Sequence, residues 1–318
     1  MKYKVLSLVI VLVILSASYA LYLYTSNITN NASLPSNNKL QVVTTTTMIT
    51  DLLKVLGEDA IDVHGLMGPG IDPHSFQATE GDVIKLSNAD IIFYNGLHLE
   101  GKMADLFEEM SKRNIPTYAV TDAIDKSKLL AGEDNYEGSY DPHIWLDVML
   151  WKDVVVFVTD ILVELDSSNA YVYSKNANNY IEELKILHEY VNTVALKVPE
   201  EHRVLITAHD AFQYFGIAYG FKVLGLQGLS TETQAGIADV RNLADFICQH
   251  KIPAIFIETS VQTRHIEALK EAVQSRNFNV EIGGELFSDS MGDLHEPEGT
   301  YIGMVKHNID TITKALNP

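Results

Sequence analysis

Residues 167–200 read SSNAYVYSKNANNYIEELKILHEYVNTVALKVPE, with neither glycine nor proline before Pro199. Apolar side chains recur near helical spacing at Tyr173, Ile181, Leu184, Leu187 and Val191. This pattern predicts one helix of roughly 28 residues, about 40 Å long at 1.5 Å per residue. A helix of that length in the middle of the chain predicts a rigid connection between two domains.

Short apolar runs alternate with amphipathic segments on both sides of this helix. The strand candidates, four before it and four after it, are residues 40–46, 62–67, 90–95, 116–120, 203–209, 221–226, 253–258 and 278–284. Helical periodicity lies between them, for instance at 48–57, 100–112, 235–250, 263–275 and 298–315. Strands that alternate with helices favour right-handed βαβ units. The sequence therefore predicts an α/β fold of two lobes, each with a roughly four-stranded, mostly parallel sheet.

The predicted lobes occupy only part of the chain. We expect an N-terminal lobe at 40–168, the linking helix at 169–198 and a C-terminal lobe at 199–318. Residues 1–24 have two lysines followed by a mostly apolar run, which is typical of a signal peptide or an N-terminal membrane anchor. Residues 25–39 are polar and rich in Asn and Ser, as expected of a tether. They also contain two glycosylation sequons, which matter only in a cell that glycosylates. The protein is therefore expected to work outside the cytoplasm, secreted or tethered.

The composition restricts the partners and the chemistry. The chain carries 42 acidic and 23 basic residues, for a formal net charge of −19. Such a balance argues against nucleic-acid binding and is compatible with a cationic ligand. Cys248 is the one cysteine, so neither an internal disulfide nor a thiolate metal cluster can form.

The tripeptide Asp-Pro-His occurs twice, at residues 72–74 and 141–143. Proline fixes its own φ and biases the preceding residue toward an extended conformation, so the histidine follows a stiff corner. His74 follows the second strand through a turn. In DPHIWLD (141–147), Asp141 as N-cap and Pro142 at the first position predict a helix with His143 in its first turn. Two stiff corners can present two imidazoles to one point.

Two further candidates lie at the carboxyl ends of strands, where open α/β sheets bind their ligands. His209 ends the first strand of the second lobe, and Asp289 follows the last strand. Together with His74 and His143 they form a set suited to Zn²⁺, Mn²⁺ or Fe²⁺. Asp147, Asp72 or Asp141 could orient the imidazoles.

Each candidate also has a structural interpretation. A single histidine is more often a hydrogen-bonded structural residue than a ligand, and Asp before Pro commonly caps a turn. Other residues could replace the chosen ligands. These are the carboxylates of Glu258, Glu285 and Asp293, and the imidazole of His98, which follows the third strand.

Several long motifs, in order, resemble those of a known family. They are GPGIDPHSFQATEGDV, DPHIWLDV, TAHDAFQYFGIAYGFKVLGLQG, PAIFIETS and GGELFSDSMGD. The chain from about residue 40 to its end is similar to the TroA-like, cluster A-I, zinc- and manganese-type periplasmic solute-binding proteins of ABC importers. The resemblance implies two βα lobes joined by one long helix. It also implies a metal site in the cleft between them, with His74, His143, His209 and Asp289 as ligands.

The resemblance further implies delivery of a captured metal ion to a membrane ABC permease with its cytoplasmic ATPase, by a monomeric protein. The chain departs from many relatives because it has no cysteine near its N-terminus to carry a lipid. Zinc-uptake members often have a His-rich loop, whereas AGEDNYEGSYDPH (131–143) has no histidine before His143. Manganese-type members often have Glu at the third ligand position, where this chain has His209. The expected cargo is therefore Zn²⁺ or Mn²⁺, with Fe²⁺ also open.

Two other functions compete with metal capture. A secreted zinc hydrolase needs an open metal position and a general base. The sequence contains no HExxH motif, although Glu258 or Glu232 could serve as the base. A surface adhesin module would fit the tether. We expect a binding protein and not an enzyme, and the long helix predicts a small movement between metal-bound and metal-free forms.

Overall fold

The computed structural model describes residues 39–132 and 139–317. The predicted signal or anchor segment, the tether and its sequons lie outside the described residues, as does most of the acidic stretch before Asp141. None of the helices in the described ranges combines the length and the apolar character that crossing a membrane requires.

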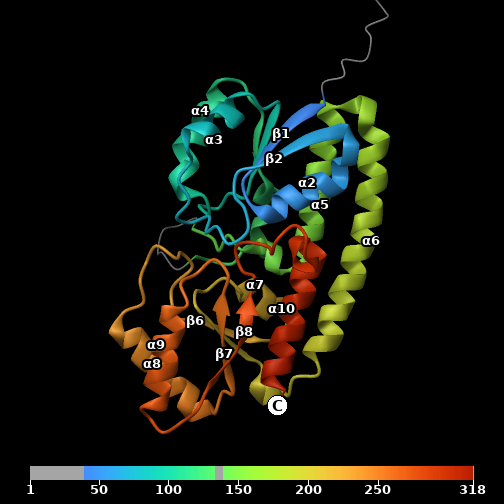
Figure 1. Ribbon diagram of the computed structural model, residues 1–318. Helices are drawn as coiled ribbons and strands as arrows, with labels where there is room; N and C mark the ends of the chain where they lie inside the picture. The colour runs from blue at the N-terminus through green and yellow to red at the C-terminus, as the bar shows by residue number, and fades with distance from the viewer. Residues whose placement is uncertain (1–38, 133–138, 318) are drawn as a thin grey trace, which may run out of the picture. The chain divides into compact units, whose positions relative to one another are not determined.

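The N-terminal lobe is built on one parallel sheet of order β2-β1-β3-β4. β1 and β2 lie side by side in Figure 1. Val42 of β1 lies opposite Val63 of β2 on one side and Ile91 of β3 on the other. The elements are β1 (Leu40–Thr44), α2 (Thr47–Gly57), β2 (Ile61–Gly65), α3 (Glu80–Ser87), β3 (Ile91–Tyr94), α4 (Ala104–Lys112), β4 (Thr117–Ala119) and α5 (Val148–Leu165). All four predicted strands are confirmed.

The C-terminal lobe also has four parallel strands, but they pair two and two. β5 pairs with β6 and β7 with β8, while β5 and β7 lie next to each other. The elements are β5 (Val204–Thr207), α7 (Gln213–Tyr219), β6 (Lys222–Gly225), α8 (Ile237–His250), β7 (Ala254–Glu258), α9 (Arg264–Gln274), β8 (Glu281–Leu286) and α10 (Tyr301–Leu316). The α/β fold with two lobes is therefore confirmed. The C-terminal lobe, however, has two parallel sheets of two strands each, where the sequence predicts one sheet of roughly four strands.

The predicted linking helix is α6 (Ala170–Ala195), whose 26 residues span about 39 Å. It contacts α2 and α5 of the first lobe and α7 and α10 of the second (Figure 1). Its buried face, which includes Leu184 and Val191, belongs to one apolar core that extends from Val42 to Leu316. A separate apolar cluster lies between α8, α9 and the strands of the C-terminal lobe.

The start of α5 differs from the prediction. Asp141, Pro142 and His143 precede a short 3₁₀ turn at Ile144–Leu146, and α5 begins only at Val148. Its N-cap is Asp147, whose carboxylate accepts a 2.8 Å hydrogen bond from the Met149 backbone N–H. The prediction that His143 lies in the first turn of a helix capped by Asp141 is therefore wrong. Asp147 is engaged at this cap and does not orient an imidazole.

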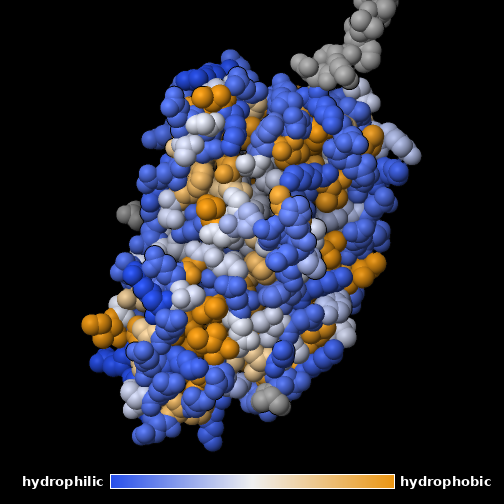
Figure 2. Space-filling view, in the orientation of Figure 1, coloured by the Kyte–Doolittle hydropathy of each residue, from blue (hydrophilic) through white to orange (hydrophobic). Residues whose placement is uncertain are grey.

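The surface facing the viewer in Figure 2 is mostly hydrophilic, and its apolar residues form separate groups. Isolated apolar side chains are ordinary on a folded protein. The candidate functional residues are instead buried polar side chains between the lobes.

Candidate metal centre

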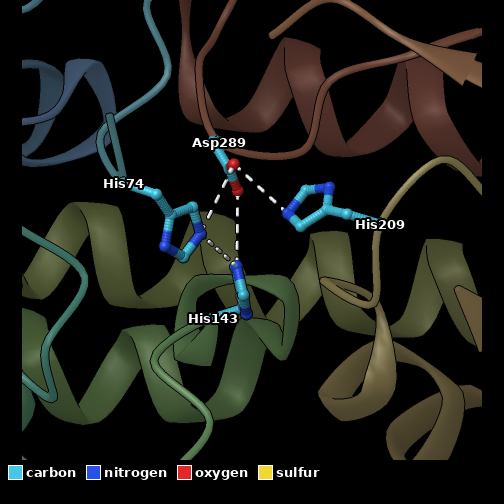
Figure 3. A group of neighbouring side chains, drawn as sticks. All are labelled: His74, His143, His209 and Asp289. Carbon is cyan, nitrogen blue, oxygen red and sulfur yellow. Dashed lines mark hydrogen bonds and ion pairs between the residues drawn. The ribbon is translucent and has the colours of Figure 1, made fainter. Parts of the chain in front are cut away.

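The structure brings His74, His143, His209 and Asp289 to one point (Figure 3). Each offers one ligand atom, and the four atoms lie within 4.8 Å of one another. All four side chains are buried. Two come from loops of the N-terminal lobe and two from loops of the C-terminal lobe, so the site lies where the lobes meet.

The two Asp-Pro-His corners use the same local device. Asp72 Oδ1 accepts a hydrogen bond of 2.9 Å from the His74 backbone N–H, and Asp141 Oδ1 accepts one of 2.9 Å from that of His143. An Asp side chain that caps a backbone N–H two residues later stabilises a tight turn. Each histidine therefore leaves its corner in a fixed direction.

The other two candidates are held at strand ends. His209 lies two residues beyond β5, and its backbone N–H donates a 2.9 Å hydrogen bond to Glu258 Oε1 at the end of β7. Asp289 lies beyond β8 between two anchored neighbours. The indole N–H of Trp145 donates to the Ser288 carbonyl at 2.8 Å, and Ser290 Oγ accepts from the Gly70 backbone N–H at 3.0 Å.

The spacing of the ligand atoms fits a small divalent ion. His74 Nε2 lies 3.3 Å from His143 Nε2. The carboxylate of Asp289 lies 3.2 Å from His209 Nε2, 3.5 Å from His143 Nε2 and 3.8 Å from His74 Nε2. Ligands about 2.0–2.1 Å from a tetrahedral ion are about 3.3 Å apart. These contacts of 3.2–3.8 Å are thus close to the spacing of a tetrahedral site, within a group whose atoms lie up to 4.8 Å apart.

Three polar atoms at this point are buried without a hydrogen-bond partner, namely His209 Nε2 and both carboxylate oxygens of Asp289. Burying a polar atom without a partner is costly, so buried polar groups in proteins are nearly always satisfied. A divalent cation at the centre of the group would give His209 Nε2 and one oxygen of Asp289 a partner.

Carboxylates fix the hydrogen positions on two of the imidazoles. Asp141 Oδ1 lies 2.7 Å from His143 Nδ1, and Glu258 Oε2 lies 2.6 Å from His209 Nδ1. An ionised carboxylate only accepts hydrogen bonds, so each Nδ1 carries a hydrogen. When the rings are neutral, the lone pair is on Nε2, which faces the other ligands.

Comparison with known proteins shows the family of the chain. The family described as zinc-uptake complex component A, periplasmic, matches residues 42–315. The chain belongs to this family. The chain is similar to the zinc-binding protein TroA of Treponema pallidum (strain Nichols), with 48% identity over 88% of this chain and 90% of TroA. It is also similar to the manganese-binding lipoprotein MntA of Bacillus subtilis (strain 168), with 42% identity over 94% of this chain and 96% of MntA. The solved structure of the periplasmic zinc-binding protein TroA superposes with a TM-score of 0.85 at 48% identity, covering 88% of this chain and all of that one.

The other candidate ligands considered from the sequence do not belong to the group of four. Glu258 is hydrogen-bonded to the ring of His209 and is not among the four grouped ligands. Glu285 and Asp293 are exposed, and His98 lies in a loop with φ of 66° outside the group. Asp141 orients an imidazole as expected, whereas Asp72 holds only the backbone of His74. The sequence did not predict that Glu258 orients the ring of His209, because the two residues lie 49 positions apart in the chain.

The charges of the metal-free site are set by burial and by the grouped residues. Burial by itself lowers the pKa of His209, but Asp289 and Glu258 more than offset this and raise it well above its ordinary value. Burial would raise the pKa of Asp289, yet the imidazoles, with His209 foremost, hold it far below its usual range. Burial lowers the pKa of His74 to about 4. At neutral pH the metal-free site therefore contains one imidazolium–carboxylate pair and a neutral His74.

Proposed function

We propose that this protein is an extracytoplasmic solute-binding protein that captures one Zn²⁺ or Mn²⁺ ion and delivers it to a membrane ABC permease for import. The observation that carries the proposal is the buried group of three imidazole nitrogens and one carboxylate with unpartnered atoms facing one another. The proteins named TroA and MntA, to which the chain is similar, are described as zinc-binding and manganese-binding.

We assign the metal ligands as Nε2 of His74, His143 and His209 and the carboxylate of Asp289. Three neutral nitrogens and one anionic oxygen suit borderline ions such as Zn²⁺, and the two oxygens of Asp289 can also serve Mn²⁺. Imidazole and carboxylate ligands also bind Fe²⁺. The family's transport role supplies the partners, namely the ion and the permease. We propose further that the permease works with a cytoplasmic ATPase and that the binding protein is a monomer.

We propose that the site carries and does not catalyse. A catalytic zinc ion keeps one position open for water, whereas four protein ligands fill a tetrahedron. The two carboxylates that a hydrolase could use as a base are engaged. Glu258 is bonded to His209, and Glu232 lies 2.5 Å from Lys102 Nζ.

The chain is proposed to function outside the cytoplasm as two lobes, 40–168 and 199–318, joined by the helix region 169–198. MntA is named a lipoprotein, but the one cysteine of this chain is Cys248, far from the N-terminus. We therefore assign residues 1–24 as a cleaved signal peptide or a peptide anchor and 25–39 as a tether.

Metal content provides the test. The full chain is stripped with a chelator and reloaded with Zn²⁺ and Mn²⁺, separately and together, and bound metal is counted by mass spectrometry. We expect about one ion per chain, with reduced content in His74→Ala, His143→Ala, His209→Ala and Asp289→Ala. His98→Ala is the matched control and should retain the ion. Absence of stoichiometric metal from the intact protein would refute the proposal.

A further inference from the structure

The four ligands are not equally enclosed. His74 is the one that lines a hollow of about 180 Å³, which opens beside the site and has room for several water molecules. Its walls come from both lobes and include Leu97, His98, Tyr140 and Glu232. Within the described residues, the Nδ1 atom of His74 also has no hydrogen-bonded carboxylate, unlike those of His143 and His209. His74 is thus the least fixed ligand and the one next to open space.

Two side-chain contacts hold the lobes together at this hollow. Thr231 Oγ1 donates a 2.7 Å hydrogen bond to Asp72 Oδ2, and Lys102 Nζ lies 2.5 Å from Glu232 Oε1. Thr231 and Glu232 belong to a partly exposed segment between β6 and α8 without regular secondary structure. The side chains of Lys102 and Glu232 are 34% and 47% exposed, so water can replace their contact at little cost.

The lobes are fastened differently elsewhere around the site. The backbone N–H of Met291 donates to Thr47 Oγ1 at 2.8 Å in a buried contact, and that of Gly70 donates to Ser290 Oγ at 3.0 Å. Breaking a buried backbone bond leaves an unsatisfied donor, which costs more than separating an exposed pair. The segment that holds Thr231 and Glu232 is therefore the easier side to open.

Asp72 connects this segment to the metal site. Its Oδ2 atom accepts from Thr231, while its Oδ1 atom accepts from the backbone N–H of His74. Ser75 Oγ also donates to Oδ2 at 2.8 Å, so the corner keeps two of its bonds when Thr231 leaves. Opening the segment can expose His74 without dismantling the turn that presents it.

We infer that the metal ion enters and leaves through the hollow beside His74, and that Thr231 and Glu232 are positioning residues that keep this route closed and so set the exchange rate. The inference rests on the proposed function. It adds the path that the metal ion takes and the residues that set how fast the ion exchanges. Neither residue is a ligand. Their loss is therefore expected to speed metal association and dissociation together and to leave the dissociation constant nearly unchanged.

The test uses the full chain loaded with Zn²⁺ and mixed with an excess of a chromogenic chelator. Thr231→Val removes the hydroxyl at nearly constant volume, and we expect dissociation about three- to tenfold faster. Glu232→Gln removes the ion pair, for about two- to fivefold. Lys102→Gln should speed dissociation by the same factor as Glu232→Gln. The variant that combines these two substitutions should be no faster than either alone, because both remove the same ion pair. Glu281→Gln breaks an exposed ion pair with Lys270 away from the hollow and should leave the rate unchanged.

Equilibrium titration of the same variants separates the explanations. A weaker equilibrium affinity with an unchanged association rate would show that Thr231 merely supports the ligand geometry and would overturn the inference. Stoichiometric zinc in all variants with wild-type exchange rates would also overturn it while leaving the proposed function intact. Absence of zinc from the wild-type chain would refute both.

Discussion

Replacing Glu258 with Gln should place a proton on the wrong nitrogen of His209. Glu258 Oε1 accepts from the His209 backbone N–H at 2.9 Å, while Oε2 accepts from Nδ1 at 2.6 Å. A backbone N–H can only donate, so the amide oxygen of Gln must take the Oε1 position. The amide NH₂ then faces Nδ1 and donates to it. A ring that has lost one of its two protons then keeps the other on Nε2, the atom that should bind the metal.

To bind the metal through Nε2, His209 of the variant must carry its proton on Nδ1 instead. The amide NH₂ of the introduced Gln then faces an Nδ1–H group. Two buried donors that face each other lose a hydrogen bond, at about 1–3 kcal/mol. The metal affinity of Glu258→Gln should therefore fall by about 5- to 150-fold.

Asp141→Asn is the matched control. One oxygen of Asp141, Oδ1, accepts from both the backbone N–H and Nδ1 of His143. The amide oxygen of Asn can take this position and preserve both bonds. The NH₂ group replaces Oδ2, which is already buried without a partner. That change lowers the stability of both forms, while the affinity should fall by less than about fivefold because only the charge assistance is lost.

The assay is competition for Zn²⁺ against a chelator of known affinity, with circular dichroism to establish that both variants are folded. Equal losses of affinity in the two variants, or a larger loss in Asp141→Asn, would refute the tautomer argument.

Three further outcomes are expected. At pH 7, metal binding should release about one proton per chain, because His209, whose pKa is raised above neutrality, must lose its proton, whereas His74, with a pKa of about 4, is already neutral. Calorimetry in buffers of different ionisation enthalpy measures this number, and zero would contradict it. Zn²⁺ at 100 times its dissociation constant should raise the free energy of unfolding by about 2.7 kcal/mol, and thermal unfolding of His143→Ala should lack this gain. In urea, Leu184→Ala on the buried face of α6 should lose about 2–5 kcal/mol, whereas Ile186→Ala, 69% exposed on the same helix, should change by less than about 0.5 kcal/mol.

The strands and the grouping of His74, His143, His209 and Asp289 could be predicted from the sequence because both leave local signals. A buried strand such as 253–258 is a short apolar run between breakers, and parallel strands bring the residues after their carboxyl ends to one edge of the sheet. The two Asp-Pro-His corners are local in the same sense, since Asp72 and Asp141 each cap a backbone group two residues away.

Contacts between residues far apart in the chain could not be predicted from these local signals. Glu258 ends a strand as a ligand would, and only its 2.6 Å contact with Nδ1 of His209 shows that it orients this ring instead. The separation of β5–β6 from β7–β8 depends on how two neighbouring strands pair, which the periodicity of each strand does not contain. In DPHIWLD, two Asp residues compete as N-caps. Asp147 is the N-cap of α5, while Asp141 Oδ1 accepts hydrogen bonds from the backbone N–H and from Nδ1 of His143.

The last helix of the chain completes the core of the first lobe. Tyr301 at the start of α10 stacks on Trp151 of α5 at 5.2 Å, and its backbone N–H donates to Asp51 of α2 across 250 residues. The apolar core that extends to Leu316 is therefore complete only when the final 16-residue helix is in place. The smaller apolar cluster within residues 43–110 does not include this helix, so the first lobe has one core of its own and shares the other with the end of the chain.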